Sequence, residues 1–424
     1  MNEDFSYVGG ELCAEQVTIT DLVKEYGTPL YVYSHSALAR QFNSFRNAFS
    51  SIPHLICFAM KSNSNIAILR LFSEMGGGLD IVSGGELYRA VKAGVPGERI
   101  VFAGVGKSDE EIEYALSKDV LMFNVESEEE MYNINKVAQK NNKIARVALR
   151  VNPNVDPKTH PYISTGLKKS KFGIDITKAK EEYARAANFT SLELSGVHCH
   201  IGSQITTTSP FADAVEKVVE LVTSLRGDGH EIRFLNLGGG LGISYNDEVP
   251  PHPDEYSQAI VPLIKDLNCK IIFEPGRFIS GNAGILITKV LYKKENPEKR
   301  FVIVDAGMND LIRPSLYEAF QEILPVEEKL LETSRYVSDL VGPICESGDY
   351  LAKDRELPEL SRGNLVAVMS SGAYGFTMAS NYNSRPRPPE LLVKEKESFL
   401  IRERESYEDL IKGEKIPPFL MSKE

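Results

Sequence analysis

The sequence predicts an α/β protein, a (β/α)8 TIM-like barrel with a second, mainly β C-terminal domain. Between residues 54 and 277, short apolar runs alternate with helical patterns about every 20 to 40 residues, the rhythm of β-α units. Most runs are rich in Val, Ile and Leu, as expected for parallel strands buried on both faces. From about residue 281 the regular helices disappear, and a chain of 424 residues is too long for one ordinary core.

Eight strands are expected in the barrel. They are predicted at residues 54–60, 79–82, 100–103, 121–125, 146–151, 192–198, 233–237 and 270–273. Eight β-α units could instead form an open doubly wound sheet, but such a sheet would carry a G-x-G-x-x-G fingerprint after its first strand. Because no such fingerprint follows residue 60, the closed barrel is favoured.

Helix signals lie between the strands. Ser108 with Glu111, and Ser127 with Glu130, form two capping-box pairs that mark helix starts. Apolar residues at 215, 218, 219, 222 and 225 form a stripe that predicts a further amphipathic helix.

The second domain is expected to contain strands without regular helices between them. These strands are predicted at 285–292, 301–304, 336–340, 365–369 and 399–402. The expected domains are a segment at 1–30 that packs with the β domain, a cofactor-binding barrel at 31–280, and the β domain at 281–424.

Composition excludes several functional classes. The net charge of -11 argues against a nucleic-acid surface, which needs a dense cationic patch. No apolar run approaches the roughly 20 residues that span a bilayer, and the start of the chain lacks the features of a secretory signal. The five cysteines are odd in number and contain no C-x-x-C pair, which disfavours disulfides and structural zinc. We expect a cytoplasmic protein with reduced thiols and a small-molecule partner, without nucleic acid or membrane.

Polar residues follow four of the predicted barrel strands. In a β/α barrel, catalytic groups lie where strands end and loops begin. The first strand leads into Lys61, the sixth into His200, the seventh into the glycine run 238–240, and the eighth into the E-P-G-R segment 274–277. Together these strand ends predict a cofactor site.

Each strand-end feature has a chemical interpretation and a plainer alternative. A partly desolvated Lys61 would have a lowered pKa and a free amine for a Schiff base, although lysines also cap barrel rims. The glycine run would let backbone N–H groups approach a phosphate, helped by a helix beginning behind it, although such runs are often tight turns. Glu274 could keep the ring nitrogen of a pyridine cofactor protonated, and Arg277 could bind a carboxylate. Alternatively, Glu274 and Arg277 could form an ion pair with each other.

A metal site is not expected. His198 and His200 lie two apart on one strand and point to the same side, which is compatible with metal binding. However, no acidic or cysteine partner recurs at ligand spacing. A flat imidazole stacked on an aromatic cofactor accounts for His200 without a metal.

Six motifs, in order along most of the chain, carry a family resemblance. They are F-A-M-K-S-N at 58–63, H-I-G-S-Q at 200–204, G-G-G-L-G-I at 238–243, E-P-G-R at 274–277, C-E-S-G-D at 345–349 and G-A-Y-G at 372–375. The chain resembles the diaminopimelate decarboxylases, which belong to the barrel-type pyridoxal-phosphate-dependent decarboxylases of fold type III. The resemblance implies decarboxylation of meso-2,6-diaminopimelate to L-lysine and CO2, the last step of lysine biosynthesis, with pyridoxal 5′-phosphate as cofactor.

The resemblance also implies roles for individual residues. Lys61 would carry the cofactor, His200 would stack on its ring, and Cys345 would return a proton after CO2 leaves, arriving from the second subunit of a homodimer. The further cofactor-binding residues would be Ser203, Gly239, Gly240, Glu274, Gly276, Arg277 and Tyr374. The substrate would be bound by Arg277, Arg313, Tyr317, Glu346 and Tyr374.

Other functions remain open at this stage. Related decarboxylases act on ornithine, arginine or a carboxylated polyamine such as carboxynorspermidine, but Glu346 with Arg277 and Arg313 suits a substrate with both an ammonium and a carboxylate at its far end. An alanine-racemase-like enzyme would have arginine in place of Glu274 at the ring nitrogen. A non-catalytic cofactor carrier should lack Cys345. Outside such a motif, a lone cysteine is more often a small buried apolar residue than a catalytic one.

Overall fold

The computed structural model describes residues 4–156 and 171–421. Residues 157–170 therefore lie outside the described residues. The chain folds into two compact units. The barrel unit contains residues 36–283 and 372–377, and the β unit contains residues 1–35, 284–371 and 378–424. No helix within the described ranges is both long and apolar enough to cross a membrane.

Eight parallel strands close the barrel, which confirms the predicted fold class. Around the barrel, each strand pairs with the next, and the last strand pairs with the first. The strands are β5 (His54–Ala59), β6 (Gly78–Ile81), β7 (Ile100–Phe102), β8 (Met122–Val125), β9 (Ala145–Asn152), β11 (Leu192–His198), β12 (Phe234–Asn236) and β13 (Lys270–Phe273). A short β10 (Ile174–Asp175) pairs parallel with the end of β9. Each of the eight predicted strand ranges overlaps its observed strand.

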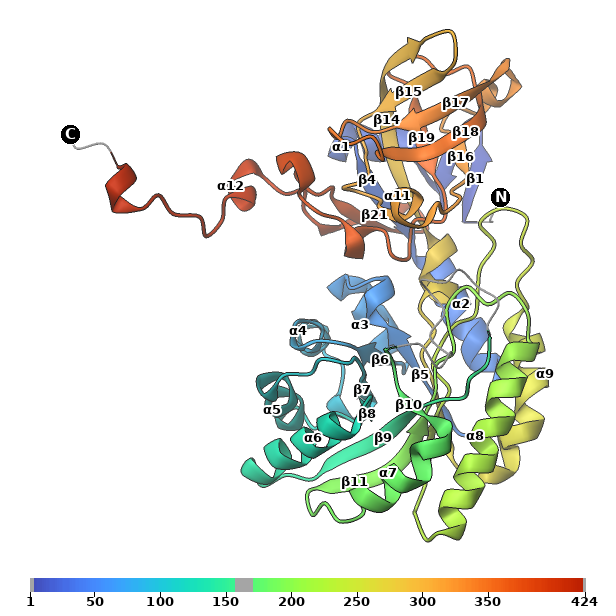
Figure 1. Ribbon diagram of the computed structural model, residues 1–424. Coiled ribbons are helices and arrows are strands. Elements are labelled where there is room, and N and C mark those ends of the chain that lie inside the picture. The colour runs from blue at the N-terminus through green and yellow to red at the C-terminus, as the bar shows by residue number, and fades with distance from the viewer. Residues whose placement is uncertain (1–3, 157–170, 422–424) are drawn as a thin grey trace. The chain divides into compact units, whose positions relative to one another are not determined.

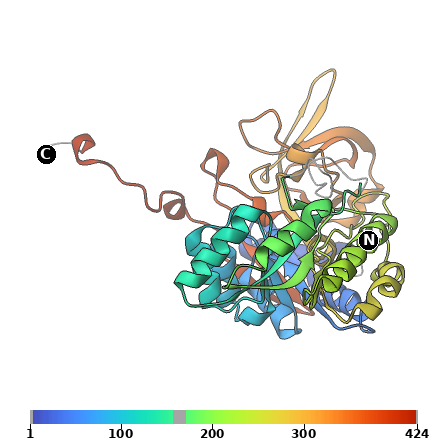
Figure 2. The ribbon, with the colours of Figure 1, turned by 60° about the horizontal axis from the view of Figure 1, so that its bottom comes forward.

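Helices surround the barrel strands on the outside, as Figures 1 and 2 show. They are α2 (His35–Ala48), α3 (Ile66–Glu74), α4 (Gly84–Lys92), α5 (Asp109–Ser117), α6 (Glu128–Lys140), α7 (Ala179–Ala186), α8 (Ser209–Gly227) and α9 (Pro253–Ile264). The short α10 (Arg277–Ser280) follows β13, and all four of its residues are buried. The predicted apolar stripe lies on α8, where residues 215, 218, 222 and 225 are buried.

Of the two predicted capping boxes, one is complete and one is half formed. At the start of α5, Ser108 and Glu111 bond each other's backbone N–H groups. At the start of α6, the Ser127 hydroxyl accepts from the Glu130 N–H, but the Glu130 carboxylate accepts from the N–H of Glu126 and from Lys107 instead. The buried Lys107 and the Glu126 N–H thus donate to this carboxylate in place of the Ser127 N–H.

The second unit is mainly β, as predicted. It comprises β1 (Phe5–Val8), β2 (Glu11–Ala14), β3 (Val17–Thr18), α1 (Ile19–Tyr26), β4 (Leu30–Ser34), β14 (Gly284–Glu295), β15 (Arg300–Val304), α11 (Arg313–Tyr317), β16 (Ile323–Pro325), β17 (Arg335–Val341), β18 (Tyr350–Pro358), β19 (Leu365–Val368), β20 (Glu390–Lys394), β21 (Glu397–Arg402) and α12 (Tyr407–Leu410). The five strands predicted for this region are all present. The strands β1 to β4, β16, β18 and β20 were not predicted.

Strand β4, from near the start of the chain, lies inside the main sheet of the β unit. It pairs antiparallel with β14 on one side and parallel with β20 on the other. Its Leu30 and Val32 are fully buried in the core of this unit, together with Ile285 and Leu391. The beginning and the end of the chain therefore share one core.

Candidate active site

The carboxyl ends of the barrel strands bring the predicted cofactor residues into one region. Backbone hydrogen bonds tie the loops together: Ala59 N–H donates to the Pro275 carbonyl at 3.1 Å, and Glu274 N–H donates to the Gly238 carbonyl at 2.7 Å. Tyr374 belongs to the same unit, and its N–H donates to the Ser62 carbonyl at 2.8 Å. Loops distant in sequence thus form one continuous surface of the barrel.

Lys61 lies directly after β5, and its amine is only partly covered. Its Nζ is 3.2 Å from Oδ2 of Asp80, and 41% of the Lys61 side chain is exposed whereas Asp80 is fully buried. Burial by itself lowers the pKa of Lys61, but the charges of Asp80, Tyr374 and Glu274 outweigh it, so the pKa is raised. The expectation of a lowered lysine pKa is therefore wrong, because it overlooked the neighbouring acids.

Asp80 is a functional candidate that the sequence interpretation missed. Burial and the nearby Glu274 raise the pKa of Asp80 to about 7, against the opposing effect of Lys61. Its Oδ1 is buried and has no hydrogen-bond partner among the described residues. The available signal was an acid inside the short apolar strand 78–81, where a charge needs a partner.

Glu274 lies just beyond β13 and accepts hydrogen bonds from two asparagines. Its Oε1 accepts from Nδ2 of Asn236 at 2.6 Å and from Nδ2 of Asn124 at 3.1 Å. Nε2 of His198 lies 3.6 Å from the other carboxylate oxygen. Burial raises the pKa of Glu274, but His198, Lys61 and the Asn236 amide more than offset this, so the pKa is lowered. The carboxylate is therefore held in its charged form.

His200 is held as a neutral ring. Burial, together with the positive charges of Lys61 and Arg150, lowers its pKa well below the usual value. Its Nδ1 accepts from the Gly239 N–H at 3.2 Å, which places the proton of the neutral ring on Nε2. Arg150, which is paired with Glu126 at 2.8 Å, also donates to the His200 carbonyl at 3.5 Å.

The glycines of the site are required by close backbone packing. A Cβ on Gly239 would lie 2.2 Å from the Glu274 carbonyl oxygen, and one on Gly276 would lie 3.0 Å from the side chains of Ala59 and Ser62. Gly240 has a backbone φ of +121°, a conformation that residues with a side chain rarely adopt. No helix begins directly behind the glycine run, since α9 begins at Pro253. The suggestion that such a helix supports phosphate binding is therefore wrong for this loop.

Arg277 contacts residues from three other segments of the barrel unit. Its Nη1 donates to the Tyr245 hydroxyl at 2.6 Å, and its Nη2 donates to Oγ of Ser203 at 3.1 Å. Its guanidinium also lies 4.8 Å from the ring centre of Tyr374. These contacts fix the planar fork of a buried arginine.

The other predicted residues belong to the β unit. The loop 342–349, which carries Cys345 and Glu346, is held by Asp349, whose carboxylate accepts from the N–H groups of Met308 at 2.6 Å and Ile344 at 2.7 Å. Cys345 and Glu346 are exposed. Ser315 donates to the Gly348 carbonyl at 2.6 Å and so joins this loop to α11, the helix that carries Arg313 and Tyr317.

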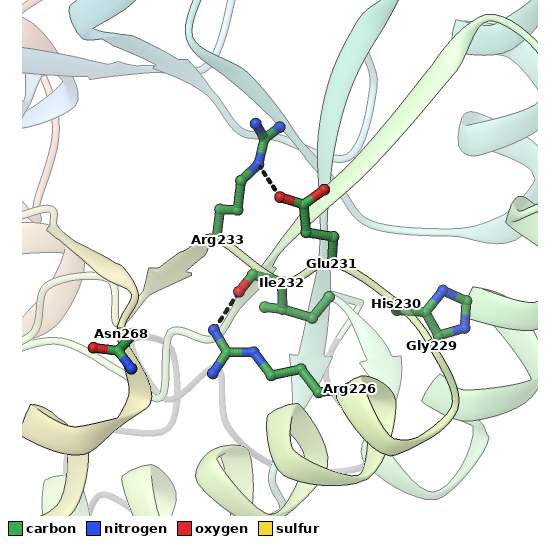
Figure 3. A pocket seen from close by; sticks show the side chains of 7 residues that line it. All are labelled: Arg226, Gly229, His230, Glu231, Ile232, Arg233 and Asn268. Atoms are coloured by element: carbon green, nitrogen blue, oxygen red, sulfur yellow. Dashed lines mark hydrogen bonds and ion pairs between the residues drawn. The ribbon is translucent and has the colours of Figure 1, made fainter.

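A surface pocket of about 480 Å³ lies at the amino ends of β12 and β13, away from the strand ends that carry Lys61 and Glu274. Figure 3 shows the residues that line it, including Arg226 and Arg233. Arg226 donates to the Ile232 carbonyl at 2.5 Å, and Arg233 pairs with Glu193 and Glu231. Both arginines therefore already have protein partners. Within residues 4–156 and 171–421, no group of three or more acidic, His or Cys side chains is arranged to hold a metal ion.

Comparison with known proteins defines the class of enzyme. The family model for the pyridoxal-dependent decarboxylase, pyridoxal binding domain, matches residues 35–281. The chain is 53% identical to a diaminopimelate decarboxylase of Aquifex aeolicus, with 97% of each chain covered, and 49% identical to that of Vibrio cholerae, with 96% of this chain and 98% of the relative covered. The chain belongs to the diaminopimelate decarboxylase family of pyridoxal-dependent decarboxylases.

Solved structures agree with this assignment. The diaminopimelate decarboxylase of Helicobacter pylori, solved in complex with L-lysine, is 45% identical and has a TM-score of 0.89, with 93% of this chain and 98% of that chain covered. The diaminopimelate decarboxylase from m. jannaschi is 40% identical with a TM-score of 0.93, and 99% of both chains is covered.

The residues of the barrel unit fit pyridoxal phosphate. Lys61 offers a partly exposed amine, and Glu274 offers a carboxylate held in its charged form by buried donors. Gly239 and Gly276 leave their backbone without a side chain, and a Cβ added at either position would crowd neighbouring protein atoms. An amine, an anion for the ring nitrogen and a glycine-lined backbone surface are the groups that this cofactor needs.

Proposed function

We propose that this protein decarboxylates meso-2,6-diaminopimelate to L-lysine and CO2 with pyridoxal 5′-phosphate, as the last step of lysine biosynthesis. The observation that carries the proposal is that the barrel unit contains both Lys61, whose side chain is partly exposed beside a buried Asp80, and Glu274, a buried carboxylate that accepts from two amide donors. The high identity of the family members supports the choice of substrate.

The proposed roles follow from the contacts in the barrel unit. When bound, pyridoxal phosphate supplies an electron sink for the bonding electrons released as CO2 leaves. Lys61 would hold the cofactor covalently, and Glu274 would face its ring nitrogen as an anion. The neutral ring of His200 would pack flat against the cofactor ring. Its phosphate would be held by Ser203, Gly239, Gly240, Gly276 and Arg277.

The substrate's far end requires groups of both charges. Arg277, Arg313 and Tyr317 would bind its carboxylate, Glu346 would bind its ammonium, and Tyr374 would contact both cofactor and substrate. Cys345 would donate the proton that replaces the lost carboxylate. We propose further that the enzyme is a cytoplasmic homodimer in which each active site receives Cys345 of the partner subunit, and that residues 31–280 form the cofactor-binding domain.

Absorbance spectroscopy tests the cofactor and the lysine together. The purified protein supplied with pyridoxal phosphate should become coloured, and borohydride reduction should fix the adduct on Lys61, where peptide mapping will find it. Lys61→Ala should abolish both the adduct and CO2 release, whereas the exposed Lys136→Ala on α6 should preserve both. A protein that stays colourless would contradict the proposal. Substrate choice is tested by comparing CO2 release from diaminopimelate, ornithine, arginine and carboxynorspermidine.

Mixing two inactive variants tests the shared active site. If Cys345 is supplied by the partner, co-expressed Lys61→Ala and Cys345→Ala chains form mixed dimers with one intact site each, and about a quarter of wild-type activity returns because half of the dimers are mixed. If each site uses its own Cys345, no mixed dimer has an intact site, and no activity returns.

A further inference from the structure

Two buried asparagines converge on one oxygen of Glu274. Asn124 lies on β8 and Asn236 lies on β12, 150 and 38 residues from Glu274 in the sequence. Both are fully buried among the strands of the barrel. A buried amide is costly unless its hydrogen bonds are made. Two such residues directed at one carboxylate oxygen therefore indicate that Glu274 requires hydrogen-bond donors at this oxygen.

The orientation of the Asn236 amide is fixed from both ends. Its Oδ1 accepts from the Gly238 N–H at 2.9 Å, so its Nδ2 must face Glu274. The Gly238 carbonyl in turn accepts from the Glu274 N–H at 2.7 Å. Asn236 thus joins the glycine run and the carboxylate into one rigid arrangement.

The position of Asn124 is fixed through its backbone. Its carbonyl accepts from Nζ of Lys107 at 2.9 Å, and this lysine also pairs with Glu130 at 2.5 Å. The side chains of Lys107 and Glu130 are only 1% and 9% exposed, so the pair is inside the protein. The carboxyl end of β8, and with it Asn124, is therefore anchored.

An amide N–H can only donate and does not titrate in the physiological range, so two of them on one oxygen stabilise the charged carboxylate and oppose protonation there. The other oxygen lies 3.6 Å from His198, too far for a hydrogen bond of ordinary length. We propose that Asn124 and Asn236 are positioning residues that hold Oε1 of Glu274, so that its second oxygen is kept as a charged acceptor for the ring nitrogen of the cofactor. This inference rests on the proposed function.

The protonation state of the ring nitrogen provides a direct test. Wild-type and variant chains are loaded with pyridoxal phosphate labelled with ¹⁵N in the ring, and the ¹⁵N chemical shift is followed from pH 5 to pH 9. Asn124→Leu and Asn236→Leu remove one donor each, and we expect each to lower the midpoint of ring-nitrogen deprotonation by about one pH unit or more. The larger shift is expected for Asn236→Leu, since its contact is shorter, 2.6 Å against 3.1 Å.

The control is Asn135→Leu. Asn135 lies on α6 and accepts from the Ser191 N–H at 3.0 Å, so its loss removes a structural hydrogen bond outside the site. It should leave the ¹⁵N midpoint unchanged. The two site variants should also lower kcat more than they raise KM. If either leucine variant fails to fold, Asn124→Ala or Asn236→Ala replaces it, with a shift in the same direction.

Other titratable groups near Glu274 also influence the titration of the ring nitrogen. They are Lys61, Asp80, His198, His200, Cys57 and Cys199. All are retained in the variants, so they contribute equally to every titration. Midpoints equal to that of the wild type in folded, cofactor-loaded variants would overturn the inference and leave the proposed function intact. A wild-type chain that takes up no cofactor would instead overturn the proposed function.

Discussion

Gly239→Ala should damage the site without removing any functional group. The added Cβ would lie 2.2 Å from the carbonyl oxygen of Glu274 and 3.0 Å from its carbonyl carbon. Ordinary contacts of a Cβ begin at 3.4 Å, so the overlap exceeds 1 Å. Because both neighbours are backbone atoms at the end of β13, neither can rotate away. The strand end must move, and it carries the Glu274 carboxylate away from Asn236.

The cost can be judged from overpacking, which typically destabilises a protein by about 1–3 kcal/mol. For a unit the size of the barrel, each kcal/mol lowers Tm by roughly 2–4 °C, so the expected fall in Tm is about 2–12 °C. Thermal unfolding of the cofactor-free chain, followed by circular dichroism, measures this change. A titration with pyridoxal phosphate should show at least about tenfold weaker binding, equivalent to about 1.4 kcal/mol.

Gly227→Ala serves as the matched control. Gly227 is the last residue of α8, and a Cβ there meets nothing within 4 Å. Its stability should be equal or slightly higher, since alanine is the better helix former, and cofactor binding should be unchanged. If Gly239→Ala matched this control in both Tm and cofactor affinity, the reasoning from close backbone packing would be refuted.

Three further outcomes are expected. Burial raises the pKa of Asp80 to about 7, so above about pH 4 the folded chain keeps a proton that the unfolded chain has lost, and stability falls as pH rises from 4 to 7. In Asp80→Asn, the Tm of the cofactor-free chain should therefore fall less between pH 5 and pH 7.5 than in the wild type. An equal fall in Tm would contradict this expectation. The lowered pKa of His200 means that stability is lost as pH falls below about 6.5, where the unfolded imidazole gains a proton; His200→Phe should reduce the loss of Tm between pH 6.5 and pH 5. Asp349→Ala removes the acceptor of the Ile344 N–H, in the loop of Cys345, and of the Met308 N–H, in another segment of the β unit. This loss should cost about 2 kcal/mol or more and lower kcat more than Asp349→Asn does in steady-state assays.

The barrel could be predicted from the sequence because its strands are buried on both faces. Apolar runs such as 54–60 and 100–103 overlap the observed β5 and β7, since parallel strands buried on both faces appear as nearly continuous apolar runs. The strand ends then made Lys61 and Glu274 candidates for a cofactor site by their position.

The missed elements have weak local signals. Strand β18 contains the charged run K-D-R-E and β16 has three residues ending in a proline, so their pairing partners rather than their own composition determine them. Asp80, Asn124 and Asn236 were missed for a related reason. Each is a single polar residue inside an apolar strand, and only the closed barrel shows that such residues from different strands meet at Lys61 or Glu274.

The placement of β4 determines when the β unit can be completed during synthesis. Tyr33 of β4 bonds Glu390 of β20, 357 residues further along the chain. At about 5–20 residues per second, the ribosome needs roughly 18–70 s to make the intervening residues. The barrel sequence emerges during this interval, while β4 still lacks its neighbours β14 and β20. Shortening either end of the chain should therefore leave the opposite end with an exposed, unpaired edge, and aggregation of nascent chains should be the earliest symptom.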